Sequence, residues 1–242
     1  MRRGHLVQAA LLSAVAGGIA AAVAVAFRWL PTEASTQAHR IFHLYWILTI
    51  ISIVIFAIVL GPLVFAVLKF RARRGDEEDG PPVHGNTALE VIWTAIPTVL
   101  VVFIAVISAV VLTQNGRAGR DPLQVTAVGE QFAWTFSYPG RSPASYGSLR
   151  LPLGRTVEFT LESRDVLHGF WVPNFAQKQD TVPGQIEHLV VTPTRLGTYP
   201  VICTQLCGLG HGIMRSQVTV MPAAEFDKWI ATQKSAAAAG AG

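Results

Sequence analysis

Two long runs of apolar residues without a formal charge, 41–68 and 91–112, constrain the fold of this chain more than any other feature. A helix of about 20 apolar residues crosses a bilayer, so each run predicts a transmembrane helix. Only 14% of the residues are charged, whereas soluble domains contain about 25%. Trp46 and Trp93 lie near the starts of the runs, as aromatic residues at membrane interfaces do. We therefore expect a two-helix membrane hairpin over residues 38–116.

The charges between the two runs predict the orientation of this hairpin. Four basic residues follow the first run directly: Lys69, Arg71, Arg73 and Arg74. Positively charged loops stay in the cytoplasm, so the second run delivers the chain after residue 117 to the outside. Residues 1–30 contain a third apolar stretch. It is either a signal peptide, which is the favoured interpretation, or an additional transmembrane helix.

From about residue 121 the pattern changes to short strands between Gly and Pro turns. Aromatic residues alternate with small or polar ones over 132–138, which places four aromatic side chains on one face of a strand. Several such strands predict a sandwich or a Greek-key barrel over 117–232, with a short helix over 223–233 at its end. We expect the Ala/Gly-rich tail, 233–242, to be disordered.

The charge of this second part argues against a nucleic-acid partner. Residues 117–242 contain eleven Lys/Arg and nine Asp/Glu, and nucleic-acid-binding domains are far more basic. The sequence also lacks a phosphate-binding glycine loop, a serine-nucleophile elbow and a Cys-x-x-Cys-His haem motif. These classes of function are therefore excluded as explanations of the chain.

Four metal-ligating residues fall within one segment of twelve: Cys203, Cys207, His211 and Met214. Thiolate and thioether sulfur suit Cu(I), and imidazole suits both oxidation states of copper. A mononuclear blue-copper site needs a single Cys with two His and a weak Met, so the second Cys favours two coppers bridged by two thiolates. A Cys203–Cys207 disulfide is the competing interpretation, and zinc, which seldom recruits Met, is the competing metal.

A copper site of this kind needs a second histidine from elsewhere in the domain. His168 is the candidate, because it lies in a turn-like segment, 165–173, among bulky apolar residues. A histidine met in isolation would be interpreted as a core or surface residue. The presence of the ligand segment 203–214 makes the ligand interpretation the better one, because a copper site of this kind needs a distant histidine.

These residues resemble subunit II of bacterial haem–copper cytochrome c oxidases over about residues 40–232. The chain matches the family motif Cys-x3-Cys-x3-His-x2-Met after an upstream His, and segments 86–97, 165–173 and 178–184 are also similar. The resemblance implies a membrane-anchored all-β protein: a two-helix transmembrane hairpin, after a signal peptide or third helix, followed by an extracytoplasmic cupredoxin-like Greek-key β-barrel.

The resemblance also implies a binuclear CuA centre. Cys203 and Cys207 would bridge the two coppers, with His168 and His211 as terminal ligands and with Met214 and the backbone carbonyl of Gln205 as weak ones. Electrons would enter from cytochrome c or another periplasmic donor and pass to haem in subunit I, where oxygen is reduced. The implied partners are oxidase subunit I, the other oxidase subunits and the lipid bilayer, and the implied location is the bacterial cell membrane.

The chain departs from the family at two positions. Gln205 replaces a glutamate that helps to hold magnesium, and a neutral amide is a poorer ligand for a hard cation, which weakens the expectation of magnesium. Phe132 replaces the first tryptophan of the family's electron-entry stretch, while Trp134 retains the second, so both are candidates for electron entry. Glu90 matches a family carboxylate at a proton entry, although a carboxylate there also fits the helix dipole.

Two other functions use similar chemistry. A CuA subunit of a nitric oxide reductase-type complex shares the motif and is the main alternative. A copper-storage or assembly protein would not need two membrane helices with family-like sequence. Nitrous oxide reductase is excluded because the chain lacks room for its second domain. The slightly basic outer segment also leaves open a donor other than a cytochrome c that docks on an acidic patch.

Overall fold

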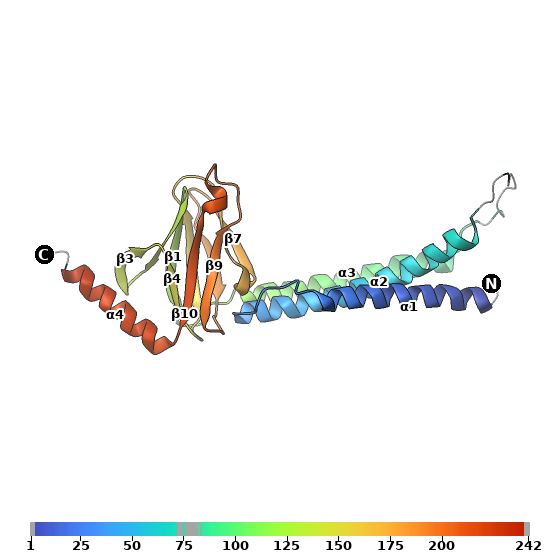
Figure 1. Cartoon of the computed structure of the whole chain (residues 1–242), viewed down its shortest axis with the longest axis horizontal. Helices are drawn as coiled ribbons and strands as arrows, with labels where there is room; N and C mark the ends of the chain where they lie inside the picture. The colour runs from blue at the N-terminus through green and yellow to red at the C-terminus, as the bar shows by residue number, and fades with distance from the viewer. Residues whose placement is uncertain (1–2, 72–74, 76–81, 83, 240–242) are drawn as a thin grey trace. The chain divides into compact units, whose positions relative to one another are not determined.

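The computed structural model describes residues 3–71, 75, 82 and 84–239. The chain divides into two compact units (Figure 1). One comprises Met1–Leu30 and His43–Ala109, and the other comprises Pro31–Phe42 and Val110–Gly242. The predicted orientation depends on the loop between the two apolar runs. Arg73, Arg74 and the acidic residues 76–79 of this loop lie outside the described residues.

The first unit contains α1 (Arg3–Ala26) and most of α2 (Thr36–Lys69) and α3 (Thr87–Asn115). Each is long and apolar enough to cross a membrane. The predicted hairpin is therefore confirmed, and α1 fits the interpretation as an additional helix better than the favoured signal peptide. Small residues let α1 approach α2 closely: a Cβ on Gly17 would lie 3.1 Å from Ala57, and one on Gly61 would contact Ser13. Such packing stabilises helix pairs in membranes.

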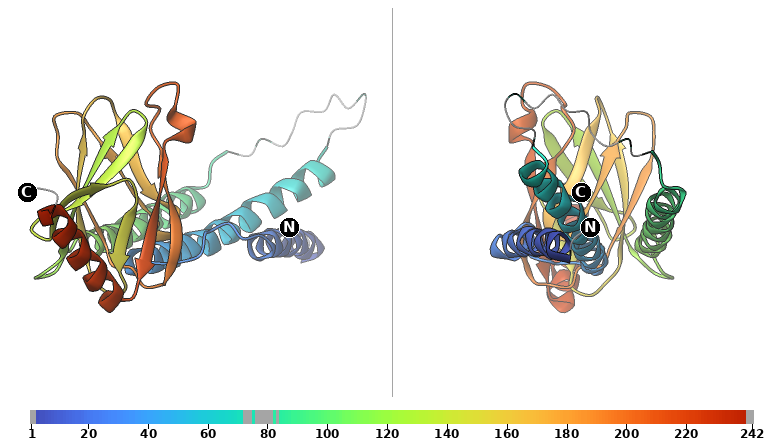
Figure 2. Two further views of the ribbon diagram at one scale, coloured as in Figure 1. Left: turned by 60° about the vertical axis from the view of Figure 1, so that its left-hand side comes forward. Right: turned by 90° about the vertical axis from the view of Figure 1, so that its right-hand side faces the viewer.

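The second unit contains two five-stranded sheets that pack face to face (Figures 1 and 2). The first sheet has the order β3 (Ser142–Tyr146), β2 (Ala133–Tyr138), β1 (Leu123–Glu130), β5 (Val157–Ser163) and β8 (Glu187–Val191). The second has the order β4 (Leu149–Pro152), β10 (Arg215–Met221), β9 (Gly197–Cys203), β6 (His168–Val172) and β7 (Gln177–Thr181). The predicted fold class, a membrane-anchored β-domain, is confirmed.

The core between the sheets is aromatic, as the alternation over 132–138 predicts. Trp134, Phe136 and Tyr138 are buried, and the Phe170 ring lies 5.4 Å from the Trp134 ring and 6.3 Å from the Phe136 ring. Each fully buried side chain of this size contributes roughly 1.5–3 kcal/mol. Phe132 is the exception, because it precedes β2 and packs against the rim of the core instead.

The C-terminal helix α4 (Ala223–Ala239) covers one end of this core. The Tyr138 ring lies 5.8 Å from the Phe226 ring and 5.5 Å from the Trp229 ring. The helix continues to Ala239, whereas the sequence predicts a disordered tail from residue 233. Residues 240–242 lie outside the described residues.

Residues 31–42, at the outer end of α2, belong to the β-domain unit rather than to the helical one. We call this segment the strap. The Ala34 N–H donates to the Asn174 carbonyl at 3.0 Å, and the Thr192 N–H donates to Gln37 Oε1 at 2.9 Å. Gln37 is buried, so its hydrogen bond offsets the cost of removing a polar group from water.

Candidate metal centre

The sheet topology brings two distant predicted ligands together. His168 is the first residue of β6, and Cys203 is the last residue of β9. These strands are antiparallel neighbours, with Phe170 opposite Cys203. His168 lies two residues from Phe170, and side chains two apart lie on the same face of a strand. Both residues are buried, so the imidazole and the thiol meet at one end of the sandwich.

The turn after β9 brings the remaining predicted ligands to the same place. It closes on itself where the Cys203 N–H donates to the Met214 carbonyl at 3.2 Å. A short 3-10 helix, η2 (His211–Ile213), fills the end of the turn. Gly208 has φ of +129°, a left-handed conformation that glycine adopts without strain. This compact turn points several side chains inward.

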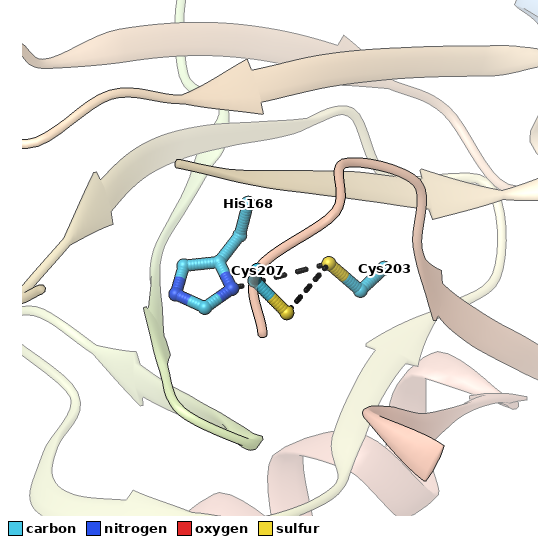
Figure 3. Close-up of side chains that lie close together, drawn as sticks. All are labelled: His168, Cys203 and Cys207. Atoms are coloured by element: carbon cyan, nitrogen blue, oxygen red, sulfur yellow. Dashed lines mark hydrogen bonds between the residues drawn. The ribbon is translucent and has the colours of Figure 1, made fainter. Parts of the chain in front are cut away.

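The ligand atoms converge within a few ångströms, as Figure 3 shows for three of the residues. Cys203 Sγ lies 3.9 Å from His168 Nδ1 and 3.9 Å from Cys207 Sγ. Cys207 Sγ lies 3.6 Å from His211 Nδ1 and 3.7 Å from Met214 Sδ. Both cysteines are free thiols, so the structure does not form the alternative disulfide.

The sixth predicted ligand also faces this cluster. The Gln205 backbone carbonyl lies 3.3 Å from Cys203 Sγ, which donates to it. The structure thus brings together every residue in the predicted copper-ligand set. That they bind copper stays a prediction at this point.

The donor set can be tested for its fit to copper. Two thiols, two imidazoles, a thioether and a carbonyl form a soft set that suits copper better than zinc, whose structural sites take four N or S ligands. A metal–sulfur bond is about 2.3 Å long, which exceeds half of the 3.9 Å between the two Sγ atoms. A metal ion on either side of the sulfur pair can therefore contact both sulfurs. The residues fit a pair of copper ions.

Burial controls the charge of the thiols. Burial, and then the neighbouring Cys203 thiol, raises the pKa of Cys207 to about 11. The Cys207 thiol is therefore neutral at physiological pH until a cation displaces its proton.

Asp165 is part of the site, although sequence analysis did not single it out. Its Oδ1 lies 2.8 Å from His168 Nε2, and its Oδ2 accepts the Gln131 N–H at 2.7 Å. Burial acts to raise the pKa of the Asp165 carboxyl, but hydrogen bonds from His168, Gln131 and Val166 hold the pKa below its ordinary value. The only sequence signal was an acidic residue three positions before a candidate ligand. Metal-bound histidines commonly donate to such a carboxylate.

The two electron-entry candidates lie on different sides of the cluster. The Trp134 ring is buried and lies 6.0 Å from the His168 ring. Phe132 covers the outer turn instead: a Cβ on Gly208 would lie 3.2 Å from the Phe132 ring, and one on Gly210 would collide with it. Gln131 fixes the same turn because its amide donates to the Cys207 carbonyl.

Glu90 does not belong to this site. It lies in the first turn of α3, in the helical unit. Its Oε1 accepts the Asn86 N–H at 3.1 Å, while Asn86 Oδ1 accepts the Leu89 N–H at 3.2 Å. This reciprocal arrangement caps the helix start. A role for Glu90 in proton entry stays a prediction.

Known proteins are similar to this chain in both its helical part and its β-domain. Residues 22–111 match the family model for the transmembrane domain of cytochrome c oxidase subunit II, and residues 146–221 match the model for its periplasmic domain. The chain is 33% identical to cytochrome c oxidase subunit 2 of Synechocystis, covering 86% of this chain and 76% of that one. It is also 33% identical to subunit 2 of Thermostichus vulcanus, covering 83% and 77%. Among solved structures it is similar to the periplasmic domain of subunit II of Bradyrhizobium japonicum cytochrome oxidase. That likeness has 23% identity and a TM-score of 0.47 over 49% of this chain and 98% of the other.

Proposed function

The chain belongs to the cytochrome c oxidase subunit II family, and on that premise we propose that its five converging side chains and one backbone carbonyl hold the copper centre through which electrons enter the oxidase. The protein is an electron-transfer subunit of the oxidase in the cell membrane, with its β-domain outside the cytoplasm. It accepts electrons from a periplasmic donor and passes them to subunit I. The comparisons give no support to the nitric oxide reductase alternative.

The residues of the chain prepare the site for copper in three ways. The thiols of Cys203 and Cys207 would release their protons to a cation and supply two anionic sulfurs. Asp165 Oδ1 pairs with His168 Nε2, which leaves Nδ1, the ring nitrogen that faces Cys203 Sγ, available to bind a metal. Bound copper supplies the exchange of single electrons between its two oxidation states.

The β-sandwich limits the movement of these donors. His168 and Cys203 lie in paired strands, and the Cys203 N–H to Met214 carbonyl bond ties the two ends of the ligand turn together. Packing as dense as a protein interior resists displacement of buried groups. We infer that the donors keep their positions when the charge of the site changes, which favours rapid electron transfer.

The convergence of Cys203, Cys207 and His168 within 4.8 Å carries this proposal. The test is to purify the full chain in detergent, load it with copper and record optical and electron paramagnetic resonance (EPR) spectra. We expect two coppers per chain and a hyperfine pattern from one electron shared by two copper nuclei. Cys207→Ser removes one of the two cysteine sulfurs of the site and should abolish that shared pattern. A colourless protein with a Cys203–Cys207 disulfide would contradict the proposal.

A further inference from the structure

The side chain of Gln205 turns away from the metal centre that its backbone faces. Its carbonyl oxygen lies 3.3 Å from Cys203 Sγ, whereas its amide Nε2 donates to Asp180 Oδ2 at 2.9 Å. Asp180 belongs to β7, the edge strand of the second sheet. One residue therefore joins the ligand cluster to a strand that supplies none of the predicted ligands.

The absence of a side chain at Gly169 gives this bond its room. Gly169 is paired with Asp180 across β6 and β7, and its carbonyl accepts the Thr204 N–H at 3.0 Å. A Cβ on Gly169 would contact Thr204 Oγ1 and would lie 3.3 Å from both Asp180 Oδ1 and Gln205 Cγ. The Gln205 side chain thus passes over Gly169 to reach Asp180.

Gln205 and Asp180 can form their hydrogen bond without a bridging cation or proton. The amide supplies the donor and the carboxylate supplies the acceptor, and hydrogen bonds to charged groups contribute about 1.5–3 kcal/mol. A glutamate at position 205 would place two carboxylates face to face, which requires a cation or a proton between them. With Gln205 the bond forms directly.

We propose that Asp180 is a positioning residue for the metal centre: it holds the Gln205 amide and thereby fixes the direction of the Gln205 carbonyl toward the sulfur pair. This inference rests on the proposed copper-binding function. An oxygen donor favours the oxidised form of copper more than sulfur does, and weak ligands tune the potential of copper sites. Releasing the carbonyl should therefore raise the reduction potential.

The first test removes the amide without changing any charge. Gln205→Ala keeps the backbone carbonyl and deletes the hydrogen bond to Asp180. In the full copper-loaded chain, we expect the variant to keep its two coppers and to show an altered hyperfine pattern. Its equilibrium constant for one-electron reduction should rise by up to about tenfold, or about 59 mV. The matched control is Gln179→Ala, because Gln179 lies on β7 and donates to another carboxylate, Glu187, at 3.3 Å. The control should leave the potential unchanged.

The second test exchanges the roles of the two residues. In the double variant Asp180→Asn with Gln205→Glu, the amide lies on β7 and the carboxylate lies in the turn, at the same net charge. The double variant should restore the native potential and hyperfine pattern. This expectation holds even if the single variant Gln205→Ala fails to retain copper. Native values in Gln205→Ala, or a double variant displaced as far as Gln205→Ala, would overturn the proposal. Failure of the native chain to form a two-copper species would instead reject the proposed function, before any variant is compared.

Discussion

The imidazole of His168 and the carboxylate of Asp165 form a hydrogen bond of 2.8 Å between Nε2 and Oδ1. The other ring nitrogen, Nδ1, lies 3.9 Å from Cys203 Sγ. A carboxylate that holds the proton on Nε2 leaves Nδ1 free to bind metal, and it orients the ring as well. This relationship gives Asp165 a defined role in the site without direct contact to the predicted copper.

Replacing Asp165 by alanine should weaken copper binding while leaving the ligand set intact. Loss of such a carboxylate partner commonly costs 10–100-fold in metal affinity, and we expect about that range. A competition titration with a copper chelator measures it. Asp165→Asn retains an oxygen acceptor for His168 Nε2–H and should lose less. Equal affinity in the native chain and Asp165→Ala would show that the ring is held by packing alone.

Gly129 on β1 makes room for the ligand histidine. A Cβ at this position would lie 2.9 Å from His168 Cδ2 and 3.2 Å from the Trp134 ring. Gly129→Ala should therefore displace the His168 ring and reduce copper content, at a stability cost of roughly 1–3 kcal/mol for overpacking. Copper per folded chain is the measurement. Gly147→Ala is the control, because nothing lies within 4 Å of a Cβ there; full copper content in Gly129→Ala would contradict this account.

Phe132 should assist the entry of electrons from the donor. Its ring covers Gly208 and Gly210, next to three exposed apolar side chains of the same turn: Leu206, Leu209 and Ile213. Truncating an aromatic side chain at a contact surface is costly. Phe132→Ala should therefore lower kcat/KM for the donor by about tenfold, equivalent to about 1.4 kcal/mol, with copper content unchanged.

The aromatic character of Phe132 can be separated from its bulk. Phe132→Leu keeps an apolar side chain without the ring, whereas Phe132→Trp restores the indole of the family. We expect the tryptophan variant to react with the donor at least as fast as the native chain and the leucine variant to react more slowly. Stopped-flow reduction by the donor distinguishes them. Identical rates in all three variants would exclude Phe132 as an entry point.

Tyr199 should give the domain a dependence on alkaline pH. Its hydroxyl lies 3.0 Å from the Arg195 carbonyl and 3.2 Å from the Leu196 carbonyl. Burial raises the pKa of Tyr199 above its ordinary value of 10.0, although Arg195 acts in the opposite direction. A raised folded-state pKa gives stability that is present below the unfolded pKa and lost as pH rises through the folded one.

The corresponding variant is Tyr199→Phe. The variant should lower the free energy of unfolding by about 1 kcal/mol at neutral pH, because a hydrogen bond is lost. Above about pH 10, its free energy of unfolding should fall less with pH than that of the native chain. Urea unfolding followed by tryptophan fluorescence at several pH values measures both effects. A variant whose alkaline loss equals that of the native chain would assign the dependence to other groups.

The sequence predicts the cluster of candidate ligands because most of them are close together in the chain. Cys203, Cys207, His211 and Met214 lie in one turn, and only His168 needed an argument from chemistry rather than from spacing. Asp165 and Gln131 could not be assigned in the same way. Their roles depend on hydrogen bonds to His168 and Cys207, which follow from the packing of distant strands.

The membrane part shows the same division. Uncharged runs reveal helices because hydrophobic length is a local property. The strap was hidden for the opposite reason. The sequence placed the hairpin from residue 38, whereas Gln37 and its neighbours are buried through hydrogen bonds to residues more than a hundred positions later. Phe132 likewise fits the alternation of β2 in the sequence, but its ring packs against Gly208 and Gly210 of the ligand turn.

The strap has a consequence for the order in which the protein matures. Its residues are translated around the start of α2, yet their hydrogen-bond partners, Asn174 and Thr192, are translated more than a hundred residues later. The β-domain therefore completes these hydrogen bonds only when the strap is in place, because the Ala34 and Thr36 N–H groups donate to the Asn174 and Thr192 carbonyls. A domain outside the bilayer thus depends for its full set of hydrogen bonds on a segment that leads into a membrane helix.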